Sequence, residues 1–190
     1  MTKQSLKRER TNYGITVPAS QKHSKLQTFW VQRRHTLGIG QLDRGETMEF
    51  EEGRPFMESN HRGVISTLQR NGAVQTSIVV VGAYQGNAAF VSVRGNSAKV
   101  RNLRRNRQCT VMSVSDDWRG CIAVEGQAQL FDRRNTPAEE LRVLLRDVFR
   151  ACGDKDHPDW EEYDRAMVEQ DAVVVLVPPE RVYGRIPAGR

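Results

Sequence analysis

From residue 62 onward, apolar and β-branched residues gather in short runs separated by turn residues. The first two runs, RGVISTLQ (62–69) and VQTSIVVVGAY (74–84), flank Asn71-Gly72. Asn-Gly supplies the positive φ angles of a tight turn, so this pattern predicts an antiparallel hairpin. A second turn, at 85–87, leads into a third predicted strand, AAFVSV (88–93).

The spacing then changes and helices enter. Ala98, Val100 and Leu103 are the few apolar positions after 93, and Ser97 is a candidate cap for a short helix that runs to about Arg105. Strands follow at 108–115 and 121–131. A helix is predicted over 136–152, with Thr136 as its N-cap, and a second begins in 158–167. A buried strand, 171–178, and a final strand, 180–186, complete the pattern. We therefore expect an α+β fold, mainly antiparallel β, built as a small barrel with peripheral helices.

The distribution of charge changes the meaning of the composition. A net charge of +6 suggests a nucleic-acid partner at first sight. Residues 1–47, however, hold nine basic and three acidic residues, whereas 48–190 hold 20 of each. We expect 1–47 to be a basic, loosely ordered extension and 48–190 to be the folded domain. Met48, where compact patterning begins, is also a candidate for the true start of the chain.

Several function classes are disfavoured by what the chain contains. No apolar run approaches the roughly 20 residues of a membrane span, and no secretory signal is recognisable. The three cysteines share no ligand spacing, which favours a reduced, cytoplasmic protein without a metal site. No nucleophile elbow, P-loop or dinucleotide-binding glycine motif is present. An enzyme of this sequence would take its chemistry from a cofactor.

One stretch stands out by its charge. GNSAKVRNLRRNRQ (95–108) and the residue before it contain six basic side chains and no acid: Arg94, Lys99, Arg101, Arg104, Arg105 and Arg107. Nucleic acid, a membrane or a small phosphorylated molecule would satisfy this charge. Proteins that bind single strands interleave aromatic residues with basic ones. None lies between Ser92 and Val111, which makes nucleic acid an unfavoured partner.

Three segments of the chain resemble motifs of one protein superfamily, and they occur in the expected order. They are HRGVISTLQRNGAVQTS, FVSVRGNSAKVRNLRRNRQCTVM and WRGCIAVEGQAQL. They are similar to the pyridoxamine 5′-phosphate oxidase-like (PPOX class) flavin/deazaflavin oxidoreductases. The C-terminal run from Pro158 resembles the branch that uses the deazaflavin coenzyme F420. The resemblance covers about 56–190. It implies a split β-barrel homodimer with F420 at the subunit interface. The implied activity is hydride transfer from reduced F420 to an electron-poor organic acceptor such as a quinone, enone or tetrapyrrole.

The resemblance also implies a set of cofactor-binding residues and no catalytic side chain. Lys99 would be the principal phosphate ligand, with the Ser92 hydroxyl nearby, and Gln75 and Ser77 would line the ring and its ribityl chain. The remaining candidates lie at the start of the short helix and on it: Ser97, Arg101 and Asn102. Many relatives carry Arg where this chain has Ser97, and Arg94 or Arg101 is expected to compensate. Tyr183 is a candidate for the substrate side.

Three interpretations stay open. The nearest alternative is an FMN-dependent oxidase or flavin reductase of the same fold, because both cofactors carry a phosphate. A further alternative is a non-catalytic cofactor- or nucleic-acid-binding protein. For Arg104, Arg105 and Arg107 we favour a structural role.

Long β-branched runs such as SIVVVGAY (77–84) have few polar alternations and call for burial on both faces. A homodimer is therefore expected.

Overall fold

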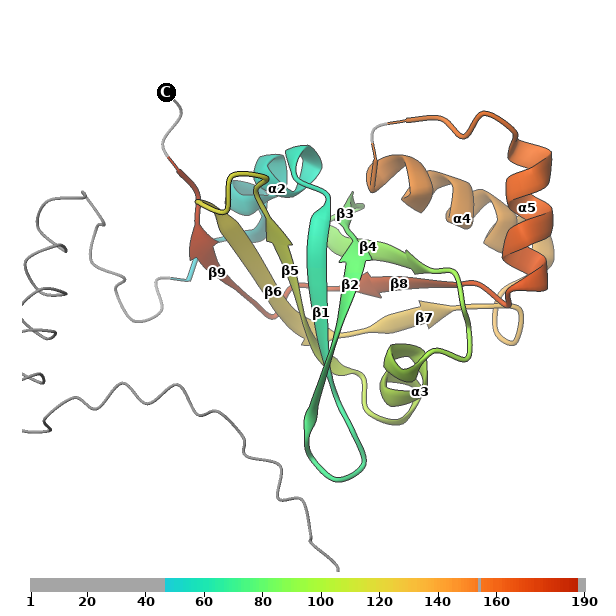
Figure 1. Ribbon diagram of the computed structural model, residues 1–190, viewed down its shortest axis with the longest axis horizontal. Coiled ribbons are helices and arrows are strands. Elements are labelled where there is room, and N and C mark those ends of the chain that lie inside the picture. Colours follow the sequence, from blue (N-terminus) through green and yellow to red (C-terminus); the bar gives the residue numbers. More distant parts are fainter. Residues whose placement is uncertain (1–46, 154, 188–190) are drawn as a thin grey trace, which may run out of the picture. The chain divides into compact units, whose positions relative to one another are not determined.

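The computed structural model describes residues 47–153 and 155–187. Of the predicted extension 1–47, all but Thr47 lies outside the described residues. Within them, nine strands form two antiparallel sheets (Figure 1). The five-stranded sheet, sheet A, has the order β2-β1-β5-β6-β9, and the four-stranded sheet, sheet B, has the order β3-β4-β8-β7. The predicted α+β split barrel, mainly antiparallel, is confirmed.

The strands and the three later helices occur along the chain in the predicted order. The strands of sheet A are β1 (Arg62–Leu68), β2 (Val74–Val80), β5 (Gln108–Val114), β6 (Cys121–Gln127) and β9 (Arg181–Arg185). Those of sheet B are β3 (Gly82–Tyr84), β4 (Asn87–Ser92), β7 (Gln129–Phe131) and β8 (Val173–Val177). The helices are α2 (Phe50–Ser59), α3 (Ala98–Arg105), α4 (Ala138–Ala151) and α5 (Trp160–Glu169).

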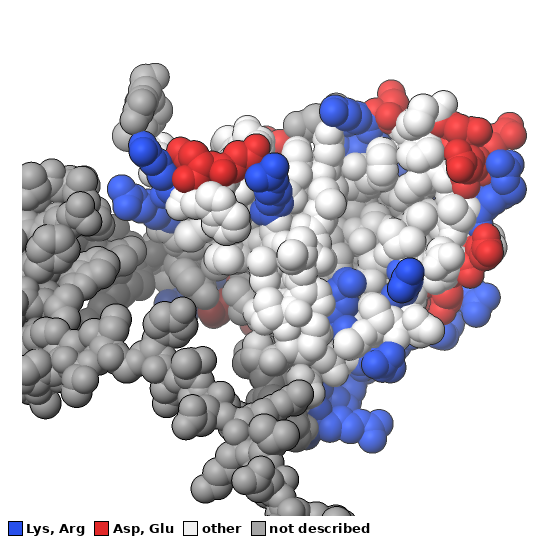
Figure 2. All heavy atoms as spheres, viewed as in Figure 1, with Lys and Arg blue, Asp and Glu red and all other residues white. Residues whose placement is uncertain are grey.

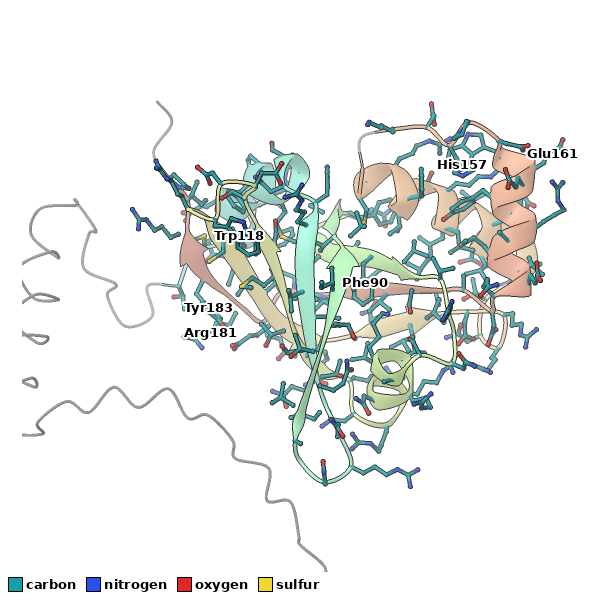
Figure 3. The ribbon with its side chains drawn as sticks, in the orientation of Figure 1. Phe90, Trp118, His157, Glu161, Arg181 and Tyr183 are labelled. Carbon is teal, nitrogen blue, oxygen red and sulfur yellow. The ribbon has the colours of Figure 1, made fainter. Side chains whose placement is uncertain are left out.

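Two hydrophobic clusters hold the layers together. Phe90, fully buried on β4, belongs to the cluster between the two sheets (Figure 3). On β8, Val175 faces the same cluster, whereas Val174 faces a second cluster formed with α4 and α5. All five residues of β8 are buried. The continuous apolar run 171–178 thus reflects a strand that is covered on both faces.

Two predicted strands each divide between the sheets. The run 74–84 breaks at Val81 into β2 of sheet A and β3 of sheet B, and the run 121–131 breaks at Ala128 into β6 and β7. Periodicity alone did not show these breaks, because the apolar pattern continues through them. Gly82 allows the crossing at Val81, since a Cβ there would lie 1.9 Å from the carbonyl oxygen of Ala151.

The predicted hairpin at Asn71-Gly72 is present, but its turn differs from the predicted type. Gly72 has a φ of +82°. The Gln69 and Ala73 backbones close the loop with a 2.8 Å hydrogen bond. Asn71 does not have a positive φ. Two successive positive φ angles occur instead at Gln85 (47°) and Gly86 (74°), so the tight two-residue turn lies between β3 and β4.

The beginning of the domain contains a helix that the pattern did not predict. Helix α2 buries Phe50, Gly53, Phe56 and Met57 although it contains Pro55. The predicted cap of α4 also requires correction. Pro137 occupies the N-cap position, and the neighbouring threonine donates its hydroxyl hydrogen bond to an asparagine side chain instead. In the part of the chain that the structure describes, no helix combines the length and apolar character needed to cross a membrane.

Candidate cofactor-binding site

Helix α3 is fixed to the domain by a buried face and by one arginine. Val100 and Leu103 are fully buried. Arg104 donates to the Asp132 carboxylate (2.8 Å) and to the Gly95 carbonyl oxygen (3.0 Å), which ties the end of α3 to the loop that precedes it. Although burial acts to raise the pKa of Asp132, the hydrogen bond from Arg104 holds that pKa below its usual value. Arg104 is thus a structural residue, as favoured from the sequence.

The start of α3 carries no side-chain cap. Ser97 occupies the predicted N-cap position, but its hydroxyl makes no hydrogen bond to the helix. That hydroxyl lies 3.3 Å from the hydroxyl of Ser92, which is 1% exposed and donates to the Arg94 carbonyl oxygen. The buried Ser92 hydroxyl thus holds the backbone of the loop that precedes α3. The first N–H groups of a helix have no intrahelical partner and carry partial positive charge, so this end of α3 suits an anion.

Lys99 lies in the first turn of α3 and is half-buried. Within the described part of the chain, its ammonium group forms no hydrogen bond or ion pair. Burial lowers the pKa of Lys99 below its ordinary value, because no nearby acid offsets the loss of water. A cation that is partly desolvated and lacks a counter-charge would be stabilised by a bound anion. The residues at this end of α3 therefore fit a cofactor phosphate.

A chain of side-chain hydrogen bonds joins α3 to β1 and β2. Asn102 donates to the Thr67 hydroxyl (3.0 Å), which donates to the side-chain oxygen of Gln75 (3.1 Å). The Gln75 amide nitrogen donates in turn to the Ser77 hydroxyl (2.7 Å). We call Asn102, Thr67, Gln75 and Ser77 the relay. Three predicted site residues thus come together, one turn of helix beyond Lys99.

Thr67 was missed by the sequence reasoning. The available signal was its place in β1, where burial alternates and Gly63, Ile65 and Thr67 are the buried positions. A hydroxyl residue at an inward position of a strand needs an internal hydrogen-bond partner. The pattern of β1 alone therefore marks Thr67 as a node of an internal polar network.

The other basic residues near α3 divide into two groups. Arg105 donates to the carbonyl oxygen of Leu68, so it ties α3 to the end of β1. Arg101 donates to the carbonyl oxygen of Asn96 in the loop before the helix, and its side chain is exposed. Arg94 and Arg107 are exposed as well. Figure 2 shows basic side chains gathered over and around α3. Lys99 differs from these arginines by its partial burial.

The outer face of sheet A carries a row of apolar side chains whose β2 end is exposed. Ile78, Val64, Met112, Ala123 and Tyr183 are paired in register across all five strands and form one row. Ile78 is 88% exposed. Figure 2 shows few charged side chains over these strands. Exposed apolar side chains gathered on one face are suited to contact with another molecule.

Tyr183 lies on that outer face, not beside the relay. Its row contains Ile78, whose side chain points to the opposite face of β2 from Ser77. The Arg181 guanidinium lies 4.7 Å from the centre of the Tyr183 ring, and both side chains project from β9 (Figure 3). Burial and the nearby Glu125 carboxylate raise the pKa of Tyr183. Within one chain, the structure does not bring Tyr183 to the predicted cofactor residues.

The described part of the chain contains two concavities near these elements. One of about 370 Å³ adjoins the relay at Thr67 and is also lined by Ser66, Leu68 and Glu125. A larger one, of about 680 Å³, lies between α4 and the β3–β4 turn, where Tyr84 donates to Asp147 (3.4 Å). The larger concavity contains none of the predicted residues. The candidate site is therefore defined by Lys99, which has no charge partner among the described residues, and by the relay, not by the volume of a concavity.

Several proteins of known structure have a similar fold. A conserved hypothetical protein of Mycobacterium tuberculosis is 18% identical, with a TM-score of 0.59 over 77% of this chain and 96% of that one. A putative 5-nitroimidazole antibiotic resistance protein of Bacteroides thetaiotaomicron is 13% identical, with a TM-score of 0.54 over 73% and 84%. A heme-binding protein of Mycobacterium smegmatis is 21% identical, with a TM-score of 0.54 over 75% and 56%. At these identities the likeness concerns the fold.

A comparison of the sequence gives the family. A family model described as pyridoxamine 5′-phosphate oxidase matches residues 50–185. This chain therefore belongs to the pyridoxamine 5′-phosphate oxidase family.

Proposed function

We propose that the protein is a reductase that binds coenzyme F420 and passes a hydride from it to an electron-poor organic acceptor, such as a quinone, enone or tetrapyrrole. The observation that carries the proposal is the half-buried Lys99 ammonium, unpaired in the described structure, at an uncapped helix start. This arrangement suits a cofactor that bears a phosphate. The resemblance of the C-terminal run to the F420-using branch selects the deazaflavin.

The proposed roles follow from where each group lies. Lys99 and the first N–H groups of α3 hold the phosphate. The relay positions the Ser77 hydroxyl where the ring and its ribityl chain would lie. When bound, the deazaflavin supplies the hydride. The protein's own contribution is then to orient the acceptor over the ring and to exclude water, so no side chain is required to act as an acid.

FMN is the alternative cofactor. The family model that matches the chain is described as an oxidase, and an FMN phosphate would be held by the same groups. The two cofactors therefore share the phosphate site, and the choice between them depends on the ring and on the C-terminal residues.

We also propose that the protein acts as a homodimer through the outer face of sheet A. Ile78, Val80 and Val74 are exposed on β2, an edge strand of that sheet. A second copy related by a two-fold axis would cover this apolar face. Tyr183 would then reach a cofactor only by way of the partner, because it lies on the covered face.

Titration of the purified protein with F420 and with FMN tests the proposal. We expect tighter binding of F420, measured side by side by calorimetry. Lys99→Ala should weaken both interactions, while Lys155→Ala, at an exposed lysine remote in sequence, should change neither. Tighter binding of FMN than of F420 would overturn the assignment of the cofactor.

A further inference from the structure

The hydrogen-bond direction along the relay is fixed from one end. The backbone carbonyl oxygen of Thr76 can only accept a hydrogen bond. The side-chain nitrogen of Gln75 lies 2.8 Å from it. The other terminal atom of Gln75 must therefore be the oxygen, and this atom lies 3.1 Å from the Thr67 hydroxyl. Because an amide oxygen only accepts, Thr67 must donate.

Thr67 has one hydrogen, and both of its acceptors, the side-chain and backbone oxygens of Gln75, belong to one residue. Its oxygen is then left to accept from Asn102, at 3.0 Å. Thr67 is 2% exposed, so water does not compete for either bond. The Asn102 amide is thereby oriented with its nitrogen toward β1.

At the other end of the relay, Ser77 receives a hydrogen. The second N–H of Gln75 points to the Ser77 hydroxyl at 2.7 Å. The hydrogen of Ser77 itself has no acceptor in the described part of the chain. A half-buried hydroxyl that accepts one hydrogen bond and has not used its own hydrogen is able to donate to a ligand beside it.

We propose that Thr67 is a positioning residue that, together with the Thr76 carbonyl oxygen, holds the Gln75 amide, so that the Ser77 hydroxyl accepts from Gln75 and presents its own hydrogen to the bound cofactor. The relay thereby selects a ligand with an acceptor atom, a carbonyl oxygen or a ring nitrogen, at that point. This inference rests on the proposed function, because the ligand is the ring system of F420 or FMN. Without the Thr67 hydroxyl, the Gln75 amide would keep its bond to the Thr76 carbonyl oxygen but would lose the partner of its own oxygen, so its position beside Ser77 would be less firmly held.

A double-mutant cycle on the full chain tests this role. Thr67→Val removes the hydroxyl with little change in shape, and Ser77→Ala removes the donor. We expect each single variant to weaken F420 binding by about three- to tenfold, the range for one neutral hydrogen bond. Because Thr67 acts through Ser77, the double variant should bind no more weakly than Ser77→Ala alone. Thr67→Ser, which restores the hydroxyl, should bind within about twofold of the wild type.

The outcomes separate this inference from the proposed function. If Thr67→Val weakens binding equally with and without Ser77, Thr67 acts through packing and the inference is wrong, even where Lys99→Ala confirms the phosphate site. If Lys99→Ala has no effect while the cycle is non-additive, the phosphate assignment is wrong and the relay stands. If the wild type binds neither cofactor, both fall. Side-chain amide NMR signals of Gln75 and Asn102 in the unliganded protein give a second measure. They should shift in Thr67→Val and return in Thr67→Ser, and unchanged signals would overturn the inference.

Discussion

Replacing Lys99 by Met should have opposite effects on cofactor binding and on the stability of the unliganded protein. Methionine keeps an unbranched apolar stem and removes the charge. In the structure the ammonium group is half-buried without a partner in the described residues, so its lowered pKa reflects a desolvation cost. A bound phosphate would supply the missing partner. The same residue should therefore cost stability in the empty protein and contribute affinity in the complex.

The magnitude of the binding effect follows from the type of contact. A hydrogen bond to a charged group contributes about 1.5–3 kcal/mol, which corresponds to roughly a ten- to hundredfold loss of affinity. Calorimetric titration with F420 and with FMN measures it. Lys155→Met, at an exposed lysine, is the matched control and should leave both dissociation constants unchanged.

The stability effect has a defined pH dependence. The folded protein holds Lys99 at a lower pKa than the unfolded chain, so the unfolded chain binds the proton more tightly. Stability is therefore reduced at neutral pH and recovers as pH rises through the folded pKa toward the ordinary value of 10.5. Urea unfolding should show Lys99→Met to be more stable than the wild type at pH 7, with the difference shrinking in alkaline solution. A variant that is less stable and binds cofactor normally would refute the reasoning.

Three further predictions concern the supports of the site and the outer face of sheet A. Gly95→Ala should destabilise the protein by about 1–3 kcal/mol in urea unfolding, because the added Cβ would lie 2.0 Å from the Asp171 carbonyl oxygen. Asp132→Asn should cost about 1.5–3 kcal/mol at neutral pH through its weakened bond to Arg104. Since the pKa of Asp132 is lowered by that bond, the contribution is present above pH 3.8 and lost as pH falls through the folded pKa, so the two unfolding curves should converge in acid. If the protein is the proposed homodimer, light scattering should find a dimer for the wild type and a folded monomer for Ile78→Asp, and a dimer in both would place the interface elsewhere.

The sequence was informative about the fold wherever the residue pattern reports on a single environment. The β8 run is buried at every residue, and α4 buries Leu141, Leu145 and Val148 on one face, so each pattern matches one environment. It was uninformative where one apolar run serves two sheets, as at Val81 and Ala128, because both parts need apolar residues. Helix α2 was missed since Gly53 and Pro55 disfavour a helix locally. The burial of Phe50, Phe56 and Met57 against the core outweighs that propensity.

For the candidate site, the residue types could be predicted but not their connections. The resemblance named Asn102, Gln75 and Ser77, and the structure joins them through a residue that it did not name, Thr67. A relay of this kind depends on register between β1 and β2, where Thr67 is directly paired with Gln75. Register depends on the hairpin turn, and the turn was itself predicted with the wrong geometry. Contacts between side chains on different elements are therefore the part that a single sequence conveys least.

The two halves of the proposed site are held by one short helix, and this arrangement explains why an unpaired charge is tolerated there. One side of α3 is fixed by buried Val100 and Leu103 and by the Arg104–Asp132 ion pair. Lys99 and Asn102, one turn apart, project from another side. The firmly held side offsets the cost of a half-buried cation that has no partner among the described residues. A folded protein normally avoids such a cation, and the places where it does not are those that a ligand completes. The position of Lys99 on a rigid support, one turn from a relay of fixed direction, is the strongest physical reason to locate the cofactor at α3.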